Sequence, residues 1–181
     1  MTSSQKKITQ TALPSYFAKM RGGAELPARA NLQQVAISWL GGSLAIGVIA
    51  YLAMLSHTTL ILGSFGATCV LVFGFPDSPF SQPRNVIIGH CLSSLIGLLF
   101  VALLGVHWWS IALSVGTAIA VMQLTRTVHP PAGSNPVIVM LTAPGWDFLL
   151  TPTLIGSVLL VLVAVLFNNL PRERAYPKYW I

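Results

Sequence analysis

Charged side chains are scarce in this sequence, and acidic ones are the scarcest. Asp, Glu, Lys and Arg together make up 8% of the 181 residues, and only 4 residues are acidic. A typical soluble domain carries about 25% charged residues, so this scarcity excludes an ordinary water-soluble surface. Hydrophobic residues account for 54% of the chain, and we therefore predict an integral membrane protein.

Cysteine is also rare, and an early apolar leader is missing. Cys69 and Cys91 both lie in apolar stretches without metal-type spacing, which excludes a disulfide framework and a cysteine metal site. We expect them to be small packing residues. The first thirty residues are basic rather than apolar, which argues against a secretory signal. We interpret them as a cytoplasmic tail with a short amphipathic piece around residues 16–20; a weak likeness to an organelle transit peptide is the alternative.

What the chain does contain is a series of long apolar segments. A membrane-spanning helix needs about 20 apolar residues. Four segments approach or reach this length, at residues 35–55, 86–105, 108–124 and 153–170, and two are shorter, at 59–75 and 131–143. We predict an all-α polytopic membrane helix bundle with about six hydrophobic segments, the two short ones broken or re-entrant. A transmembrane domain at 34–170 then lies between basic tails at 1–33 and 171–181.

Lys and Arg cluster before the first apolar segment and after the last. The positive-inside rule then places both termini in the cytoplasm, here of the inner cell membrane, and requires an even number of crossings. Four crossings would put Arg84 and Arg126 outside, whereas six would put both inside and Asp147 outside. We favour six.

The two halves of the chain share a faint similarity. The first half contains GATCVLVFGFPDSPFSQP and the second contains GSNPVIVMLTAPGWDFLLTP, so Gly66–Thr68 matches Gly133–Asn135. Prolines follow at similar spacing, at Pro76 and Pro83 in the first half and at Pro144 and Pro152 in the second. With three segments in each half, the two halves would insert into the membrane in opposite orientations. This is the inverted-repeat plan of many transporters. Chance likeness between two apolar Gly/Pro-rich stretches is the alternative.

The stretch TRTVHPPAGSNP, residues 125–136, breaks the backbone inside an apolar region. Pro130 and Pro131 cannot donate backbone hydrogen bonds, but Pro131 can begin a helix. We predict a helix start at Pro131–Gly133 with free N–H groups around Ala132–Asn135, and a matching start at Gly66–Thr68. Because a helix start is electropositive and binds anions, two facing starts predict a small-anion site near the bilayer midplane.

The predicted substrate-binding residues come from these two helix starts and their flanks: Ser64, Gly66, Ala67, Thr68, Arg84, Arg126, His129, Pro130, Pro131, Ala132, Gly133, Ser134 and Asn135. The two arginines either draw anions in or anchor the topology at the lipid headgroups. His129 caps the turn, contacts substrate or carries a proton. His90 lies inside an apolar segment, and we expect a buried, hydrogen-bonded histidine there.

Small residues recur every four positions at Gly89, Ser93 and Gly97. This spacing lets helix backbones approach closely in lipid, and we expect it to serve packing within the bundle. Such faces also make a homo-oligomer plausible.

Several motifs, HPPAGSNP, GSFGATCVLVFG, SPFSQPRNVIIGH and LTAPGWDFLLTP, occur in order between about residues 34 and 170. Together they resemble the HPP family of integral membrane proteins, which is named for the tripeptide at His129–Pro131. The family is usually described with four transmembrane helices. Members in cyanobacteria and plant chloroplasts are implicated in nitrite transport, so the resemblance implies a small monovalent anion as substrate.

We therefore predict a transporter or channel for a small inorganic anion, with nitrite as the first candidate. The alternative is a membrane scaffold or regulatory protein without transport activity. An enzyme is not expected, because no buried carboxylate is available to orient His129 beside a nucleophile such as Ser134. We expect no cofactor and no metal. The predicted partners are the anion, the lipid bilayer and a second copy of the chain, with no nucleic acid.

Overall fold

The computed structural model describes residues 15–181, which fall into two units, one that ends at residue 30 and one that spans residues 31–181. Within the first unit, a short helix α1 (Tyr16–Lys19) begins after Ser15, whose hydroxyl accepts a hydrogen bond from the Ala18 amide at 3.3 Å. All of its side chains are exposed. The helix lies where a short amphipathic piece was expected, while the earlier lysines, Lys6 and Lys7, lie outside the described residues.

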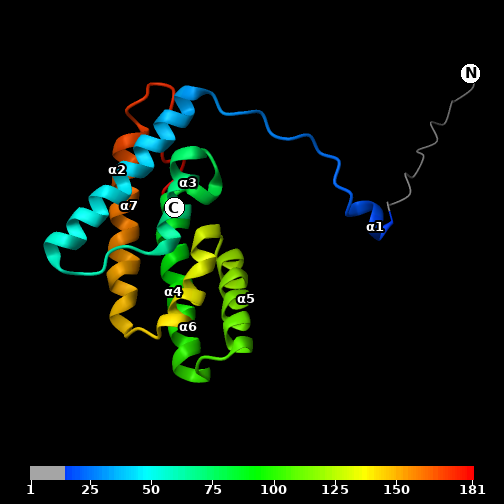
Figure 1. The fold of residues 1–181 in the computed structure, drawn as a ribbon, viewed down its shortest axis with the longest axis vertical. Helices are drawn as coiled ribbons and strands as arrows, with labels where there is room; N and C mark the ends of the chain where they lie inside the picture. The colour runs from blue at the N-terminus through cyan, green and yellow to red at the C-terminus, as the bar shows by residue number, and fades with distance from the viewer. Residues whose placement is uncertain (1–14) are drawn as a thin grey trace, which may run out of the picture. The chain divides into compact units, whose positions relative to one another are not determined.

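The second unit contains only helices and connecting segments across residues 31–181 (Figure 1). In chain order the elements are α2 (Leu32–Ser56), α3 (Gly63–Gly74), the 3₁₀ turn η1 (Pro79–Ser81), α4 (Pro83–Leu104), α5 (Trp108–Leu124), the 3₁₀ turn η2 (Pro130–Ser134), α6 (Asn135–Thr142), the 3₁₀ turn η3 (Trp146–Leu149), the π turn η4 (Leu150–Leu154) and α7 (Ile155–Asn168). This confirms the predicted polytopic helix bundle.

The helix boundaries follow from local chemistry. Asn31 and Gln34 form a reciprocal capping box at the start of α2, with side-chain to backbone distances of 2.8 and 3.2 Å. This arrangement satisfies amides that have no partner inside the helix. His57 ends α2 in a left-handed conformation with a φ of 52°. Pro83 begins α4, a position where its missing N–H costs no intrahelical bond.

Three helical stretches are long and apolar enough to cross a membrane: Leu32–Ser56, Pro83–Leu104 and Trp146–Asn168. The helices α3 and α5 are apolar but shorter. Large apolar side chains, among them Trp39, Leu103 and Leu166, remain more than half exposed on the outside of the bundle. An apolar exterior of this kind is suited to lipid rather than to water.

Consecutive helices of the second unit alternate in direction (Figure 1). One cavity is lined by Asn31, Phe75 and Arg174, so the start of α2, the end of α3 and the chain after α7 share one end, which we name the tail end. Another is lined by Thr58 and Asp147 and marks the opposite, far end. Successive helices therefore point alternately toward the far end and the tail end (Figure 1), although α3 and α6 are short, with 12 and 8 residues.

The positions of the two interior arginines agree with six alternating segments. Arg84 Nη2 donates to the Thr125 carbonyl at 3.1 Å, next to Arg126 in the chain. Arg84 and Arg126 therefore share the tail end with the C-terminal basic residues, while Asp147 lies at the far end. In a four-crossing arrangement the two arginines would lie opposite the termini.

The small-residue stripe of α4 packs inside the bundle, as expected. A methyl group at Gly97 would lie 2.9 Å from Val139 Cβ and 3.0 Å from Pro136 Cα. A methyl group at Gly89 would lie 2.9 Å from His129 Cβ. The absence of side chains along this stripe lets η2 and α6 pack directly against the α4 backbone.

Candidate functional site

The first broken segment begins earlier than its sequence suggests. Residues Thr59–Leu62 are non-helical, and α3 starts at Gly63, with no side chain capping its first turn. The expected start at Gly66–Thr68 is therefore wrong by three residues. Since helical N–H groups after the first turn bond to carbonyls four residues back, the amides left without helical partners belong to Gly63 and Ser64. The Phe65 amide already bonds to the Leu62 carbonyl at 2.9 Å.

The second broken segment does not offer the free amides that were expected at Ala132–Asn135. The Ala132 amide donates to the His129 carbonyl at 2.9 Å, and the Asn135 amide donates to the Ala132 carbonyl. The reason is the 3₁₀ turn η2, whose tighter hydrogen-bonding pattern uses the amides at the start of the segment. Only the first segment keeps the helix-start geometry that favours an anion.

The two broken segments instead meet through buried side chains. Thr68 of α3, His90 of α4, and His129 and Asn135 around η2 are each 0% exposed, and we call these four residues the histidine cluster. Thr68 Oγ1 lies 2.9 Å from His90 Nε2 and 2.9 Å from His129 Nε2. Asn135 Nδ2 lies 3.0 Å from His90 Nδ1.

One arrangement of protons satisfies the contacts of this cluster. His129 Nδ1 lies 2.7 Å from the Phe80 carbonyl, which can only accept, so Nδ1 carries the hydrogen and Nε2 accepts from Thr68. At the other side, the Asn135 amide donates to His90 Nδ1, so His90 Nε2 carries the hydrogen and donates to Thr68 Oγ1. The result is a directed chain of hydrogen bonds between two neutral histidines.

The polar chain continues across the bundle. Asn135 Nδ2 donates to Ser94 Oγ at 3.0 Å, and Ser94 Oγ lies 3.0 Å from Thr153 Oγ1. Both hydroxyl-bearing residues are fully buried. Polar groups inside a membrane protein must find partners within the protein, so this chain links η4, α4, α6 and α3 through specific contacts.

Packing around the cluster fixes the two imidazole rings. The ring of Phe65 meets His90 edge-on with centroids 5.1 Å apart, and the His90 and His129 rings have centroids 4.9 Å apart. Gly89 provides the space, because its missing side chain lets His129 and the Thr127 carbonyl approach α4. The prediction of a buried, hydrogen-bonded histidine at His90 is confirmed, but its contact with Thr68 and Asn135 was not foreseen.

Two buried polar atoms next to this network have no hydrogen-bond partner. Ser64 is 4% exposed and its Oγ is unpaired, although its carbonyl lies 3.1 Å from Thr68 Oγ1. Asn135 Oδ1 is also unpaired. Unpaired buried polar groups are uncommon and call for an explanation, such as a bound ion or water. Ser64 combines an unpaired hydroxyl with the uncapped start of α3.

Other predicted site residues lie away from the cluster. Gly66 and Ala67 are exposed on α3, and Ala67 lines a shallow, mostly apolar groove of about 480 Å³ together with Pro130, Pro131 and Ser134. Ser134 Oγ donates to the Pro131 carbonyl at 2.8 Å and forms no hydrogen bond with the cluster. Among these residues, Pro131 is buried in the η2 turn.

Gly133 and Ala132 complete the η2 turn. Ala132 is fully buried, whereas a methyl group at Gly133 would meet open space. Arg126 is exposed in a left-handed conformation with a φ of 57°, and Arg84 is partly buried with an unpaired Nε. The two arginines lie near the tail end, and neither side chain forms a hydrogen bond with the histidine cluster.

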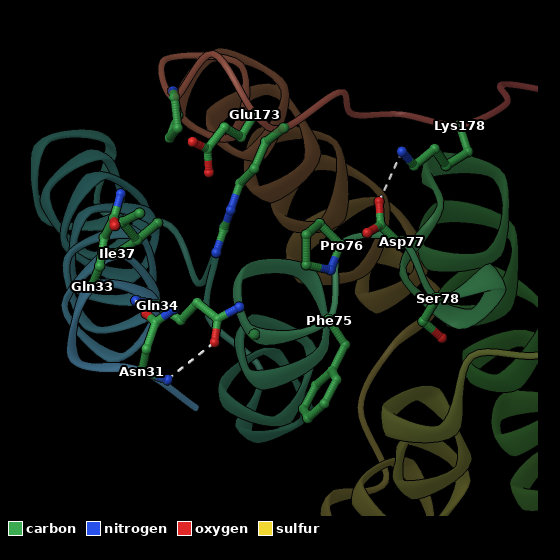
Figure 2. Close-up of a pocket in the computed structure, with 13 residues that line it drawn as sticks. Asn31, Gln33, Gln34, Ile37, Phe75, Pro76, Asp77, Ser78, Glu173 and Lys178 are labelled. Carbon is green, nitrogen blue, oxygen red and sulfur yellow. Dashed lines mark hydrogen bonds and ion pairs between the residues drawn. The ribbon is translucent and has the colours of Figure 1, made fainter. Parts of the chain in front are cut away.

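A polar cavity of about 650 Å³ opens at the tail end (Figure 2). Lys178 and Asp77 form an ion pair of 2.9 Å at its edge. Arg174 Nη1 donates to the Phe73 carbonyl near the end of α3, at 3.2 Å. A cation at this position complements the negative end of a helix. The acidic side chains of Glu173 and Asp77 also line the cavity. The cavity therefore does not strongly favour ligands of either charge.

The C-terminal tail packs against the loop that supports His129. Tyr176 is 3% exposed, and its hydroxyl donates to the Ser81 carbonyl at 2.8 Å, one residue after the Phe80 that binds His129. Burial raises the pKa of Tyr176, which keeps the hydroxyl protonated as a donor. Tyr179 bonds to Asn85, which in turn donates to the Val128 carbonyl at 2.9 Å. Nothing in the sequence marked this tail as part of the site's support.

Comparison with known proteins identifies the family. The family model described as HPP, transmembrane region, matches residues 27–177. Two transmembrane proteins of Dictyostelium discoideum are 37% and 35% identical to the chain, each over 91% of its length. The chain covers 57% and 63% of the length of these relatives. No solved structure matches. The chain belongs to the HPP family of transmembrane proteins.

Proposed function

We propose that this protein is a transporter or channel that moves a small inorganic anion, with nitrite as the first candidate, across the membrane. The observation that carries the proposal is the uncapped start of α3 beside the buried, unpaired hydroxyl of Ser64. An anion bound there would accept hydrogen bonds from this hydroxyl and from the amides of Gly63 and Ser64. It would lie one helical turn from Thr68 in the histidine cluster.

The distribution of charge favours an anion over a cation. All four acidic residues, Glu25, Asp77, Asp147 and Glu173, are exposed. A dehydrated cation in the bundle would therefore find no carboxylate to compensate for its lost hydration. An anion would find donors and the positive end of α3. The resemblance to HPP proteins implicated in nitrite transport narrows the choice among small anions.

Buried polar side chains in a membrane protein are themselves a sign of function. A cluster of two histidines, a threonine and an asparagine costs more to bury than an apolar core of the same volume. In membrane proteins such residues mark substrate or ion pathways. The cluster lies where both broken segments meet α4, which is where transporters with discontinuous helices bind their substrates.

We include in the proposal that the two halves form an inverted repeat, α2–α3–α4 and α5–α6–α7. In this repeat, α2, α3 and α4 correspond to α5, α6 and α7. Equivalent helix pairs are in contact in both halves: α2 packs on α3 and α5 packs on α6. Likewise, α4 packs on α5 and α7 packs on α2. The matched residues Thr68 and Asn135 bond to the two ring nitrogens of the same His90. Since Thr68 and Asn135 are equivalent positions that contact the same side chain, we expect His90 to lie close to a pseudo-twofold axis between the two halves.

The proposed orientation follows the basic residues. Arg84, Arg126, Arg174 and Lys178 all lie toward the tail end. The positive-inside rule then assigns this end, with both termini, to the cytoplasmic side of the inner cell membrane. Arg84 and Arg126 are proposed to attract anions toward the entrance, since they do not reach the histidine cluster.

Uptake of labelled nitrite into liposomes that contain the purified protein tests the proposal. Wild-type protein is expected to take up nitrite faster than protein-free liposomes, and Ser64→Ala is expected to slow uptake. Ser56→Ala is the matched control, because the exposed Ser56 hydroxyl bonds to the Leu52 carbonyl of its own helix. If correctly folded wild-type protein moves neither nitrite nor nitrate, transport is refuted, and a scaffold or regulatory protein takes its place.

A further inference from the structure

The histidine cluster can accept one extra proton without losing a hydrogen bond. In the neutral arrangement, the Thr68 hydroxyl donates to His129 Nε2. The same hydroxyl lies 3.1 Å from the Ser64 carbonyl. If a proton binds to His129 Nε2, the Thr68 hydrogen can turn to the Ser64 carbonyl. Thr68 Oγ1 then accepts from His90 and His129 through its two lone pairs, and every group in the chain stays paired.

His90 cannot take the proton in the same way. Its Nε2 already carries the hydrogen that it donates to Thr68, so the extra proton would have to bind at Nδ1. That atom faces Asn135 Nδ2 at 3.0 Å, and two donors would then point at each other. The unequal surroundings of the two rings therefore direct a proton to His129 rather than to His90.

The groups that face His129 carry no negative charge. From α4 the facing titratable group is His90, and Arg84 of the same helix bonds to Thr125. From α3 the neighbour of Thr68 is Cys69, a neutral thiol. The elements η1, η2, α5 and α6 contain no acidic or basic residue, and Arg126, which follows α5, is exposed.

Tyr179 of the C-terminal tail reaches only Asn85 and the Pro79 carbonyl in this region. A protonated, fully buried His129 would therefore lack a counter-ion from the protein. Since an isolated buried charge is strongly unfavourable, an anion bound nearby at the start of α3 would have to neutralise it.

We infer that His129 is a proton site that makes transport electroneutral, with one proton moving together with each anion. The inference rests on the proposed function and adds the coupled ion to it. The proton enters from one side, binds to Nε2 of His129 while the anion binds beside Ser64, and leaves with the anion on the other side. Neither charge needs to be buried alone at any stage.

The test uses full-length protein in liposomes that hold a pH-sensitive dye and potassium, with valinomycin to set the membrane voltage. Nitrate is the probe, because nitric acid is too strong to leak through lipid as the neutral acid. The expected result is nitrate uptake that acidifies the interior by one proton per anion and does not change with voltage. Uptake that follows the voltage without acidification would overturn the inference and leave the proposed function intact. If liposomes with folded protein take up neither nitrate nor nitrite, the proposed function fails as well.

Variants of Thr68 test the route. Thr68→Val keeps the volume but removes the hydroxyl that joins the two histidines, so fewer protons are expected to enter per anion. Thr68→Ser, which keeps a hydroxyl, is expected to restore the wild-type ratio. Thr142→Val is the matched control, because the exposed Thr142 hydroxyl bonds to the Ile138 carbonyl of its own helix. An unchanged ratio in folded Thr68→Val would contradict the role of this hydroxyl.

Discussion

Replacing Gly89 with alanine is expected to destabilise the protein and to impair transport together. The new methyl group would lie 2.9 Å from His129 Cβ and 3.0 Å from the Thr127 carbonyl. Neither neighbour is the free end of a flexible side chain, so the η2 segment must move away from α4. Overpacking of this kind costs about 1–3 kcal/mol. For a chain of this size, that free-energy loss corresponds to a fall in Tm of about 2–12 °C.

The assay for Gly89→Ala is thermal unfolding of the detergent-purified protein, followed by nitrite uptake in liposomes at a temperature where the variant is still folded. Displacing His129 should lengthen its contacts with Thr68 and the Phe80 carbonyl, so uptake should fall even in the folded variant. Gly116→Ala is the control, because a methyl group there meets nothing within 4 Å. If Gly89→Ala melts and transports like Gly116→Ala, the close contact between α4 and η2 is refuted.

Three further changes test separate parts of the structure. Asn135→Leu removes the donor to His90 Nδ1 and Ser94, which should cost about 1–3 kcal/mol in the free energy of unfolding, measured by denaturant titration. Tyr176→Phe deletes the hydrogen bond to the Ser81 carbonyl and should cost about 0.5–1.5 kcal/mol in the same assay. Arg84→Gln should slow nitrite uptake at low ionic strength and have less effect at high salt, because salt screens attraction between separated charges.

The lengths and positions of the apolar segments were enough to predict most of the helices. Trp108–Leu124 forms α5 as expected. The helices α2 and α4 each begin three residues before the expected segments and end within one residue of the expected ends. The last segment was harder to define, because η3 and η4 precede α7. Their irregular backbone depends on tertiary packing, which apolar composition does not encode.

Only part of the candidate site could be predicted from the sequence. Thr68, His129 and Asn135 were named because they lie next to backbone breaks, and the structure brings them together around His90. His90 itself was hard to assign, since a histidine in an apolar helix gives no indication of which distant side chains it contacts. The helix starts were misplaced because the sequence does not distinguish an extended residue from a helical one at Gly63–Gly66, or a 3₁₀ turn from an α-helical one after Pro130.

The most direct test of the account is nitrogen NMR of the histidine side chains while nitrite is added at constant ionic strength. The chain has four histidines. His90 and His129 belong to the buried cluster, whereas His57 and His107 are exposed and serve as internal controls. The account predicts saturable shifts of the His90 and His129 signals, with His57 and His107 unchanged. Nitrite that leaves the two buried histidines unchanged, or shifts all four alike, would contradict an anion site beside the histidine cluster.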